Sequence, residues 1–229
     1  MAELKVLGAG PVKRGITQVA ALFEKNSGHR VVVEFVGAPL VRERIFAGEA
    51  VDVAVVPGAT MDEFVKEGKV AGASRVVLGR SRMGLAMRKG ATAPDLSSAA
   101  AFKQSVAAAD AVVVNVASSG NCVVKLIEKL GFSAEQKSIR QPDAVKVMDY
   151  VAASDKNLLG AGQLPEIREL IHKGVAIALA GPLPDELQSI TAYDAAVPAA
   201  SANAAVAAQF TAFCATPEAR AVMSATGID

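Results

Sequence analysis

Four turns built from small residues could bind an anion, because each is expected to join a strand to a helix. They are Gly8–Pro11, Gly37–Pro39, Ser118–Asn121 and Gly160–Gln163. In an open parallel sheet such turns lie at the carboxyl ends of strands, where the following helices present free backbone N–H groups. Gly, Pro and Ser also make tight connections for purely structural reasons, so one such turn alone does not indicate a site. Four together predict a site for a small anionic ligand.

Two turns carry side chains that could take part in binding or proton transfer. Ser118 is the stronger candidate ligand, because Ser119 is expected to cap the helix that begins at Gly120. Glu166 stands on the first turn of a later helix, where its charge favourably meets the helix dipole. It is also the one carboxylate at these turns that could serve as a base.

Other residues near the turns have simpler interpretations. Lys13 and Arg14 could reach an anion from the first turn of the first helix, although a solvated helix face is the common arrangement. Cys122 is expected to pack against apolar neighbours rather than to react. Neither His29 nor His172 is placed to suggest a catalytic triad.

Known cofactor and metal motifs fit the sequence poorly. Lys13 stands where a dinucleotide-binding loop needs its third small residue, and no G-x-x-x-x-G-K-[ST] motif occurs. The sequence around Ser118 lacks the G-x-S-x-G pattern of a nucleophile elbow. Two cysteines, Cys122 and Cys214, cannot build a disulfide framework or a four-ligand zinc site. We therefore expect no metal and no cofactor.

The composition points to an α/β protein. The 229 residues are 52% hydrophobic but only 4% aromatic, without Trp, which suits helices packed on a sheet rich in Val and Ile. Lys and Arg number 24 against 23 Asp and Glu, a net charge of +1. This balance argues against nucleic acid or an anionic membrane surface as a partner.

Short apolar runs alternate with segments of helical periodicity, the pattern of a parallel sheet with crossover helices. The pattern restarts near Arg82, where a second lobe is expected to begin. We expect residues 1–80 and 193–229 in one lobe and 81–192 in the other. We also expect a monomer.

The N-terminus shows no basic segment followed by an apolar core and a cleavage site. As it stands the sequence predicts a cytoplasmic protein, and a periplasmic one if a signal peptide was removed. The long uncharged stretch Ala195–Pro217 is rich in Ala and contains polar residues, so we interpret it as a helix outside the membrane.

Several segments in order resemble the molybdate-type solute-binding proteins of ABC transporters. They are Lys5–Phe23, Val36–Ile45, Ala47–Val53, Ser118–Gly120 before a helix ending Lys129–Gly131, and Thr216–Ala219 followed by Gly227. The resemblance implies a type 2 periplasmic-binding-protein fold, in which two α/β lobes close on a small anion in the cleft between them. Relatives of this architecture also include isomerases of small tricarboxylates such as aconitate.

The chain departs from the molybdate binders at three positions that are expected to contact the ligand. Gly10-Pro11 and Gly37-Ala38-Pro39 replace hydroxyl residues, and Ala161-Gly162-Gln163 replaces a Tyr. Because a buried tetrahedral dianion needs nearly all its oxygens hydrogen-bonded, an organic carboxylate fits at least as well.

Two functions remain open. The first is a binding protein for a small anion, which would serve an ABC-transporter membrane component if exported. The second is a cofactor-independent isomerase on the same fold. The resemblance and the turns together give the expected ligand-binding residues Gly10, Pro11, Ala38, Pro39, Pro57, Arg80, Ser118, Ser119, Gly120 and Gln163.

Overall fold

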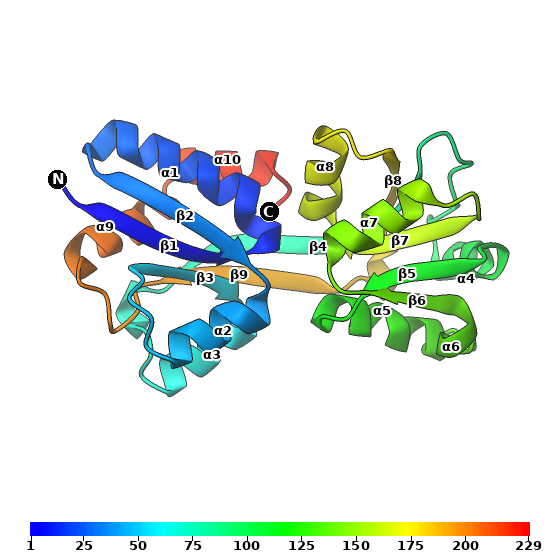
Figure 1. The fold of residues 1–229 in the computed structure, drawn as a ribbon, viewed down its shortest axis with the longest axis horizontal. Coiled ribbons are helices and arrows are strands. Elements are labelled where there is room, and N and C mark those ends of the chain that lie inside the picture. Colours follow the sequence, from blue (N-terminus) through cyan, green and yellow to red (C-terminus); the bar gives the residue numbers. More distant parts are fainter. The chain divides into compact units, whose positions relative to one another are not determined.

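A computed structural model describes residues 1–229, and the chain folds into two compact units. Unit 1 contains Met1–Ser81 and Thr191–Asp229, and unit 2 contains Arg82–Ile190. The boundaries fall in the strand β4 (Val76–Arg88) and at the start of the strand β9 (Ile190–Ala196). Each unit is an α/β layer structure with helices on both faces of its strands (Figure 1). The α/β class and the two-lobed type 2 architecture expected from the sequence are confirmed.

Unit 1 is built around three parallel strands and the antiparallel β9, in the order β2-β1-β3-β9. The remaining strands are β1 (Glu3–Ala9), β2 (Arg30–Val36) and β3 (Val53–Pro57). The helices are α1 (Lys13–Ser27), preceded by the 3-10 turn η1 (Gly10–Val12), α2 (Ala38–Phe46), α3 (Gly58–Lys66), the 3-10 turn η2 (Gly72–Ser74), α9 (Ala204–Cys214) and α10 (Pro217–Ala225).

In unit 2, β5 pairs in parallel with β7 on one side and β6 on the other, in the order β7-β5-β6. The strand β4 pairs antiparallel with both β7 and β8. Its other strands are β5 (Ala111–Asn115), β6 (Ser138–Gln141), β7 (Leu158–Gln163) and β8 (Ile177–Pro182). Its helices are α4 (Ala99–Ala108), α5 (Ser118–Lys129), α6 (Ala134–Lys137), α7 (Ala144–Ala153), α8 (Leu164–His172) and the 3-10 turn η3 (Asp185–Leu187).

Each sheet has an apolar cluster on both faces. In unit 1, Ile16 and Phe23 of α1 and Phe210 of α9 pack on one face, while Met61 and Phe64 of α3 pack on the other. In unit 2, helices α4 and α5 cover one face, and α7 and α8 cover the opposite face. Strands covered on both faces become continuous apolar runs, which is why the run 111–114 is buried throughout.

The structure extends the elements expected from the sequence. The strand β4 is 13 residues long and begins at Val76, so it runs through Arg82, where the sequence pattern restarts. The polar strand β6 and the strand β9 were not predicted. β6 lies at the end of its sheet, where alternating polar residues are tolerated, so its sequence Ser-Ile-Arg-Gln carries no strong strand signal.

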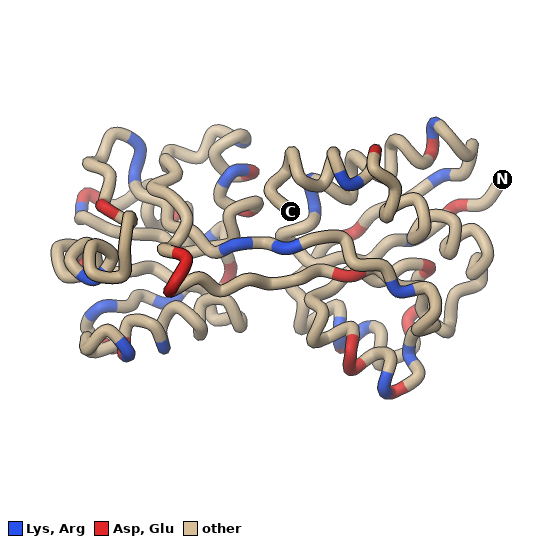
Figure 2. Tube along the Cα trace, turned by 180° about the vertical axis from the view of Figure 1, so that it is seen from behind, with Lys and Arg blue, Asp and Glu red and all other residues tan.

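Charges of both signs are interspersed over both units (Figure 2). None of the helices combines the length and the apolar character that a membrane crossing would require.

Candidate functional site

The carboxyl ends of the three parallel strands of unit 1 meet at one edge of its sheet. The register pairs Ala9 with Val36 and Gly8 with Val55, so the turns that follow these strands are neighbours. This edge brings together five of the expected ligand-binding residues. Gly10 and Pro11 form the start of η1, Ala38 and Pro39 begin α2, and Pro57 ends β3 and precedes α3.

The helices at this edge begin without a side-chain cap. No side chain accepts a hydrogen bond at the starts of η1, α1, α2 or α3, and none of them has an acidic residue in its first turn. Four other helices are capped: Ser98, Ser133, Asp143 and Thr216 accept backbone N–H groups at α4, α6, α7 and α10. The helices α8 and α9 also begin without a side-chain cap. An uncapped helix start keeps backbone donors open and a positive dipole end unneutralised, which favours an anion.

Three cations of unit 1 are candidate contacts for an anion, and two of them, Lys13 and Arg14, lie at one of these helix starts. Arg80 exchanges two backbone hydrogen bonds with Asp229, the N–H of Asp229 donating to its carbonyl at 2.9 Å, and its side chain is exposed. Arg14 is half-buried and Lys13 exposed on the first turn of α1. None of the three side chains makes an ion pair. Their charges therefore have no partner within the protein.

A buried ion pair supports the start of α3. Arg75 Nε donates to Asp194 Oδ2 at 2.7 Å, and Arg75 Nη1 donates to Asp62 at 2.6 Å. The Asp194 side chain is only 2% exposed, and its Oδ1 has no hydrogen-bond partner. Gly58, the first residue of α3, lies next to this pair, since a Cβ there would be in ordinary contact with Asp194 Oδ2, at 3.5 Å. Sequence reasoning missed this pair because its partners are 119 residues apart.

In unit 2 a corresponding edge gathers the other expected residues. Parallel pairing sets Asn115 beside Gln141 and Val113 beside Gly160, so β5, β6 and β7 end at the same edge. Ser118, Ser119 and Gly120 open α5 after β5, and Gln163 ends β7 and precedes α8.

Asn115 shapes the turn before α5. This residue is 5% exposed, and its Oδ1 accepts the N–H of Ala117 at 3.0 Å and the N–H of Gly120 at 3.1 Å. Its Nδ2 donates to Ser119 Oγ at 3.1 Å. A Cβ atom at Gly120 would overlap the carbonyl oxygen of Asn115, so only glycine fits there. Gly120 is thus structural, and its N–H is already used.

Two expectations for this turn were wrong. The helix begins at Ser118, not Gly120, and Ser119 does not cap it, because the hydroxyl bonds the Asn115 side chain instead. Cys122 is exposed rather than packed, since it faces outward on the first turns of α5, while Cys214 is buried. Ser118, in contrast, is exposed, and its hydroxyl makes no hydrogen bond within the protein.

The α5 turn leaves two donors open. The first N–H groups of a helix have no partner four residues earlier, and here the side chain of Asn115 satisfies only that of Gly120. The N–H groups of Ser118 and Ser119 face no acceptor of the protein. Arg140, which sequence reasoning missed, donates from Nη1 to Asn121 Oδ1 at 2.7 Å in the next helical position. No sequence motif marks Arg140, because only strand pairing brings it to α5.

Glu166 occupies the start of α8. A hydrogen bond to the backbone of Gln163 lowers the pKa of its carboxyl, but burial has the larger, opposite effect, and the charge of Asp143 adds to it. The net result raises the Glu166 pKa to about 7 from its ordinary value of 4.5. Although the residue as a whole is only half-buried, its carboxyl group is desolvated. Such a group can hold or release a proton near neutral pH.

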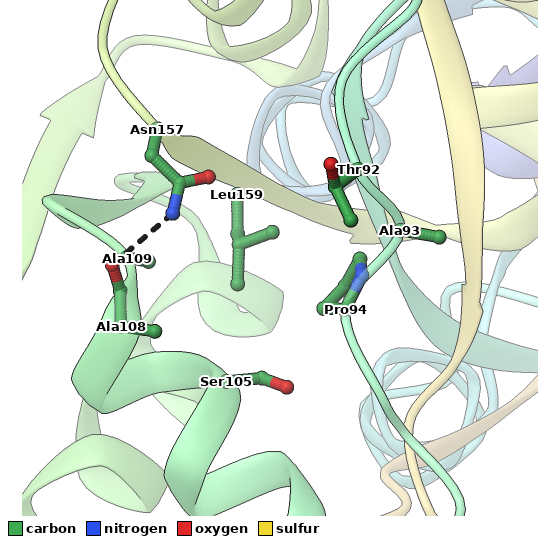
Figure 3. A pocket seen from close by; sticks show the side chains of 8 residues that line it. All are labelled: Thr92, Ala93, Pro94, Ser105, Ala108, Ala109, Asn157 and Leu159. Carbon is green, nitrogen blue, oxygen red and sulfur yellow. Dashed lines mark hydrogen bonds between the residues drawn. The ribbon is translucent and has the colours of Figure 1, made fainter.

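Two cavities of unit 2 lie away from the expected residues. One, of about 330 Å³, is lined by Thr92, Pro94, Ser105, Asn157 and Leu159 among others, and Asn157 Nδ2 donates to the Ala108 carbonyl at its wall (Figure 3). Since Leu159 is near the first residue of β7, this cavity is at the edge opposite Gln163. The second, about 310 Å³, lies beside α5 and η3. Neither contains an expected ligand-binding residue.

Comparison with known proteins gives a consistent picture. Residues 4–229 match the family model of bacterial extracellular solute-binding proteins. An aconitate isomerase from Pseudomonas sp. is 31% identical over 204 residues, covering 85% of this chain and 75% of that protein.

Solved structures share the fold. The periplasmic molybdate-binding protein of Azotobacter vinelandii has a TM-score of 0.79 at 20% identity, covering 99% of this chain and 98% of that one. A periplasmic binding protein from A. tumefaciens R10 in complex with agropinic acid has a TM-score of 0.68 at 17% identity, covering 99% and 81% of the two chains. The resemblance inferred from the sequence is confirmed: the chain belongs to the family of bacterial extracellular solute-binding proteins and has the type 2 fold of periplasmic binding proteins.

Proposed function

We propose that this protein binds a small organic anion carrying carboxylate groups. The observation that carries the proposal is that the helices after β1, β2 and β3 begin at one edge of the sheet without a side-chain cap, and that the first two N–H groups of α5 have no acceptor. The helices α4, α6, α7 and α10 carry Ser, Asp or Thr caps, whereas α8 and α9 also begin without a side-chain cap. Open N–H groups at helix starts bind carboxylates well.

The expected ligand-binding residues take different parts in this proposal. Gly10, Pro11, Ala38, Pro39 and Pro57 belong to the turns that would present backbone donors, although the three prolines have no N–H of their own. Ser118 and Ser119 would supply two N–H groups, and Ser118 also its hydroxyl. Arg80 would contribute charge. Gly120 and Gln163 would shape the turns before α5 and α8.

Carboxylate is favoured over a tetrahedral oxyanion because hydroxyl donors are scarce. Ser118 has the one free hydroxyl among the expected residues, since Ser119 is bonded to Asn115. A desolvated dianion would leave oxygens unpaired in such a site, at a cost of about 1–3 kcal/mol each. The relative at 31% identity is named for aconitate, a tricarboxylate, and one structural neighbour holds agropinic acid.

Calorimetric titration of citrate, trans-aconitate, molybdate and sulfate into one preparation tests this. We expect the two organic acids to bind more tightly than the two inorganic oxyanions. Tighter binding of molybdate would reject the carboxylate preference, and absence of heat with all four would reject anion binding of this class.

We further propose that the protein is the binding component of an ABC transporter, which requires export and a membrane partner. Membership of an extracellular solute-binding family supports this assignment. Copurification of the tagged protein from the periplasmic fraction of its native cells would test the location.

One observation favours a second candidate, an isomerase that moves a proton on an unsaturated tricarboxylate. Glu166 stands at the start of α8, at the same edge of unit 2 as Ser118. As a carboxylate it could take a proton from the methylene carbon of aconitate, the double bond would shift, and the protonated Glu166 would return the proton to the former alkene carbon. No cofactor or redox partner is needed. A pKa of about 7 suits both halves of this cycle.

Proton NMR of trans-aconitate incubated with the protein in D₂O distinguishes the candidates. Conversion to the cis isomer with deuterium incorporation, abolished in Glu166→Gln while binding persists, would support the isomerase. Binding without conversion by the native protein would leave the solute-binding function alone.

A further inference from the structure

Arg140 lies on the last strand of the unit 2 sheet, and its direction follows from strand pairing. The register sets it beside Val114, whose side chain packs with Val123 and Ile127 of α5. Directly paired residues of neighbouring strands point to the same face. The Arg140 side chain therefore lies on the α5 face, in agreement with its bond to Asn121.

The charge of Arg140 is not neutralised within the protein. Its one polar partner is the neutral amide of Asn121, at 2.7 Å, and no carboxylate lies within ion-pair distance. By contrast, Arg82 in the same unit is paired with Asp185. Since a guanidinium has five N–H donors in a planar fork, one bond to Asn121 leaves the rest available.

The amide that binds this guanidinium belongs to the first turn of α5, the turn that has open backbone donors. Asn121 follows Ser118 by three residues on α5, a rise of about 5 Å along the helix axis. Ser118 and Ser119 have N–H groups without acceptors. The Asn115 side chain fixes the conformation of this turn by accepting the N–H groups of Ala117 and Gly120. The two open N–H groups therefore belong to the same helical turn as the Asn121 side chain that binds the Arg140 guanidinium.

An apolar side chain stands beside these donors. Val116 joins β5 to α5, donates its N–H to the Gln141 carbonyl at 3.0 Å, and is 55% exposed. A small inorganic ion gains nothing from contact with an exposed isopropyl group. The carbon skeleton of an organic acid, in contrast, can pack against this group and remove it from water.

We propose that Arg140 is a specificity-determining residue of this protein, binding one carboxylate of an organic ligand together with the Ser118 and Ser119 N–H groups while Val116 contacts the adjoining hydrocarbon. This inference rests on the proposed carboxylate binding. A planar carboxylate matches the guanidinium fork in a bidentate geometry, which a tetrahedral oxyanion uses less fully.

Three variants test the assignment by calorimetry with citrate, trans-aconitate and molybdate as probes. Arg140→Gln should weaken citrate and trans-aconitate binding by about 10- to 100-fold, and Arg140→Lys should restore only part of it because the charge remains but the fork is lost. Arg88→Gln is the matched control. Arg88 is likewise exposed and unpaired, but the pairing of Ala86 with Gly160 places it toward the opposite edge of the sheet.

The outcomes separate this inference from the function on which it rests. If the native protein binds none of the probes, the proposed function fails and Arg140 has no ligand to select. If the native protein binds carboxylates and Arg140→Gln binds them within twofold, the proposed function stands and this inference is overturned. Equal losses for molybdate and for the organic acids would also overturn it, since Arg140 would then act through charge alone. Unchanged thermal unfolding of the ligand-free variant would show that the lost affinity is not lost folding.

Discussion

The Asn115 side chain accepts the backbone N–H of Gly120 at 3.1 Å, and this bond shapes the start of α5. An amide that precedes the helix thereby does what a serine or aspartate cap does elsewhere in the chain. Because it satisfies the third N–H of the helix from inside, the first two stay open on the outside. The anion binding that we propose for this turn therefore depends on a residue that does not itself contact the ligand.

Replacing Gly120 with Ala should unfold this turn. The new Cβ would overlap the Asn115 carbonyl, so the first turn of α5 must move, and we expect a loss of about 3 kcal/mol or more in the free energy of unfolding. Urea denaturation measures it. Gly72→Ala is the control, because a Cβ there meets Val65 at an ordinary 3.5 Å. A Gly120→Ala protein as stable as Gly72→Ala would contradict this description of the turn.

The two serines of the turn should separate into a binding and a structural role. Ser119→Ala removes the bond to Asn115 and should cost about 1 kcal/mol of stability. Ser118→Ala removes a free, exposed hydroxyl and should leave stability unchanged while weakening citrate binding severalfold. Paired urea denaturation and calorimetry check both. The assignment fails if the stability loss belongs to Ser118→Ala.

Glu166 should make stability depend on pH in a direction opposite to that of an ordinary salt-bridged carboxylate. Its pKa is raised in the folded protein, so the folded state holds this proton more tightly than the unfolded chain does. The resulting stabilisation is complete below about pH 4.5 and is lost as the pH rises to about 7. Its upper bound is about 3 kcal/mol.

Urea denaturation of the native protein and of Glu166→Gln between pH 4 and 8 tests this. As the pH rises from 4 to 8, the free energy of unfolding of the native protein should fall relative to that of Glu166→Gln. Glu169→Gln, on the same helix and paired with Lys173, reports the effect of losing a carboxylate without that desolvation. A difference that stays constant with pH would refute the raised pKa.

Removing one partner of the Arg75–Asp194 ion pair should strongly lower the free energy of unfolding. Arg75→Gln would leave the buried Asp194 carboxylate without its charge partner, and we expect a loss of about 3–5 kcal/mol. The double variant with Asp194→Asn should recover part of this loss, because the uncompensated charge is gone. Arg42→Gln, which breaks the exposed pair with Glu63, should cost about 1 kcal/mol or less. Additive losses in the double variant would show that the two side chains are not coupled.

The sequence by itself determined the elements whose signals are local. Short apolar runs alternating with segments of helical periodicity predicted parallel strands joined by crossover helices, and the parallel pairs of β1 with β2 and β3 and of β5 with β6 and β7 follow this pattern. The small-residue turns also marked the edges at which helices begin, because glycine, proline and the strand-to-helix change are visible within a few residues.

Tertiary structure alone decided which side chains serve those turns. Asn115 and Arg140 come from adjacent strands, and Asp194 meets Arg75 across 119 residues, so no local pattern could connect them. Local patterns likewise suggested that Ser119 would cap α5 and that Cys122 would be packed, and both depended on packing around Asn115 and α5 that lies outside a short window. Periodicity reports whether a residue faces a core, whereas hydrogen-bond partners and desolvation depend on strands and helices that meet only after the chain has folded.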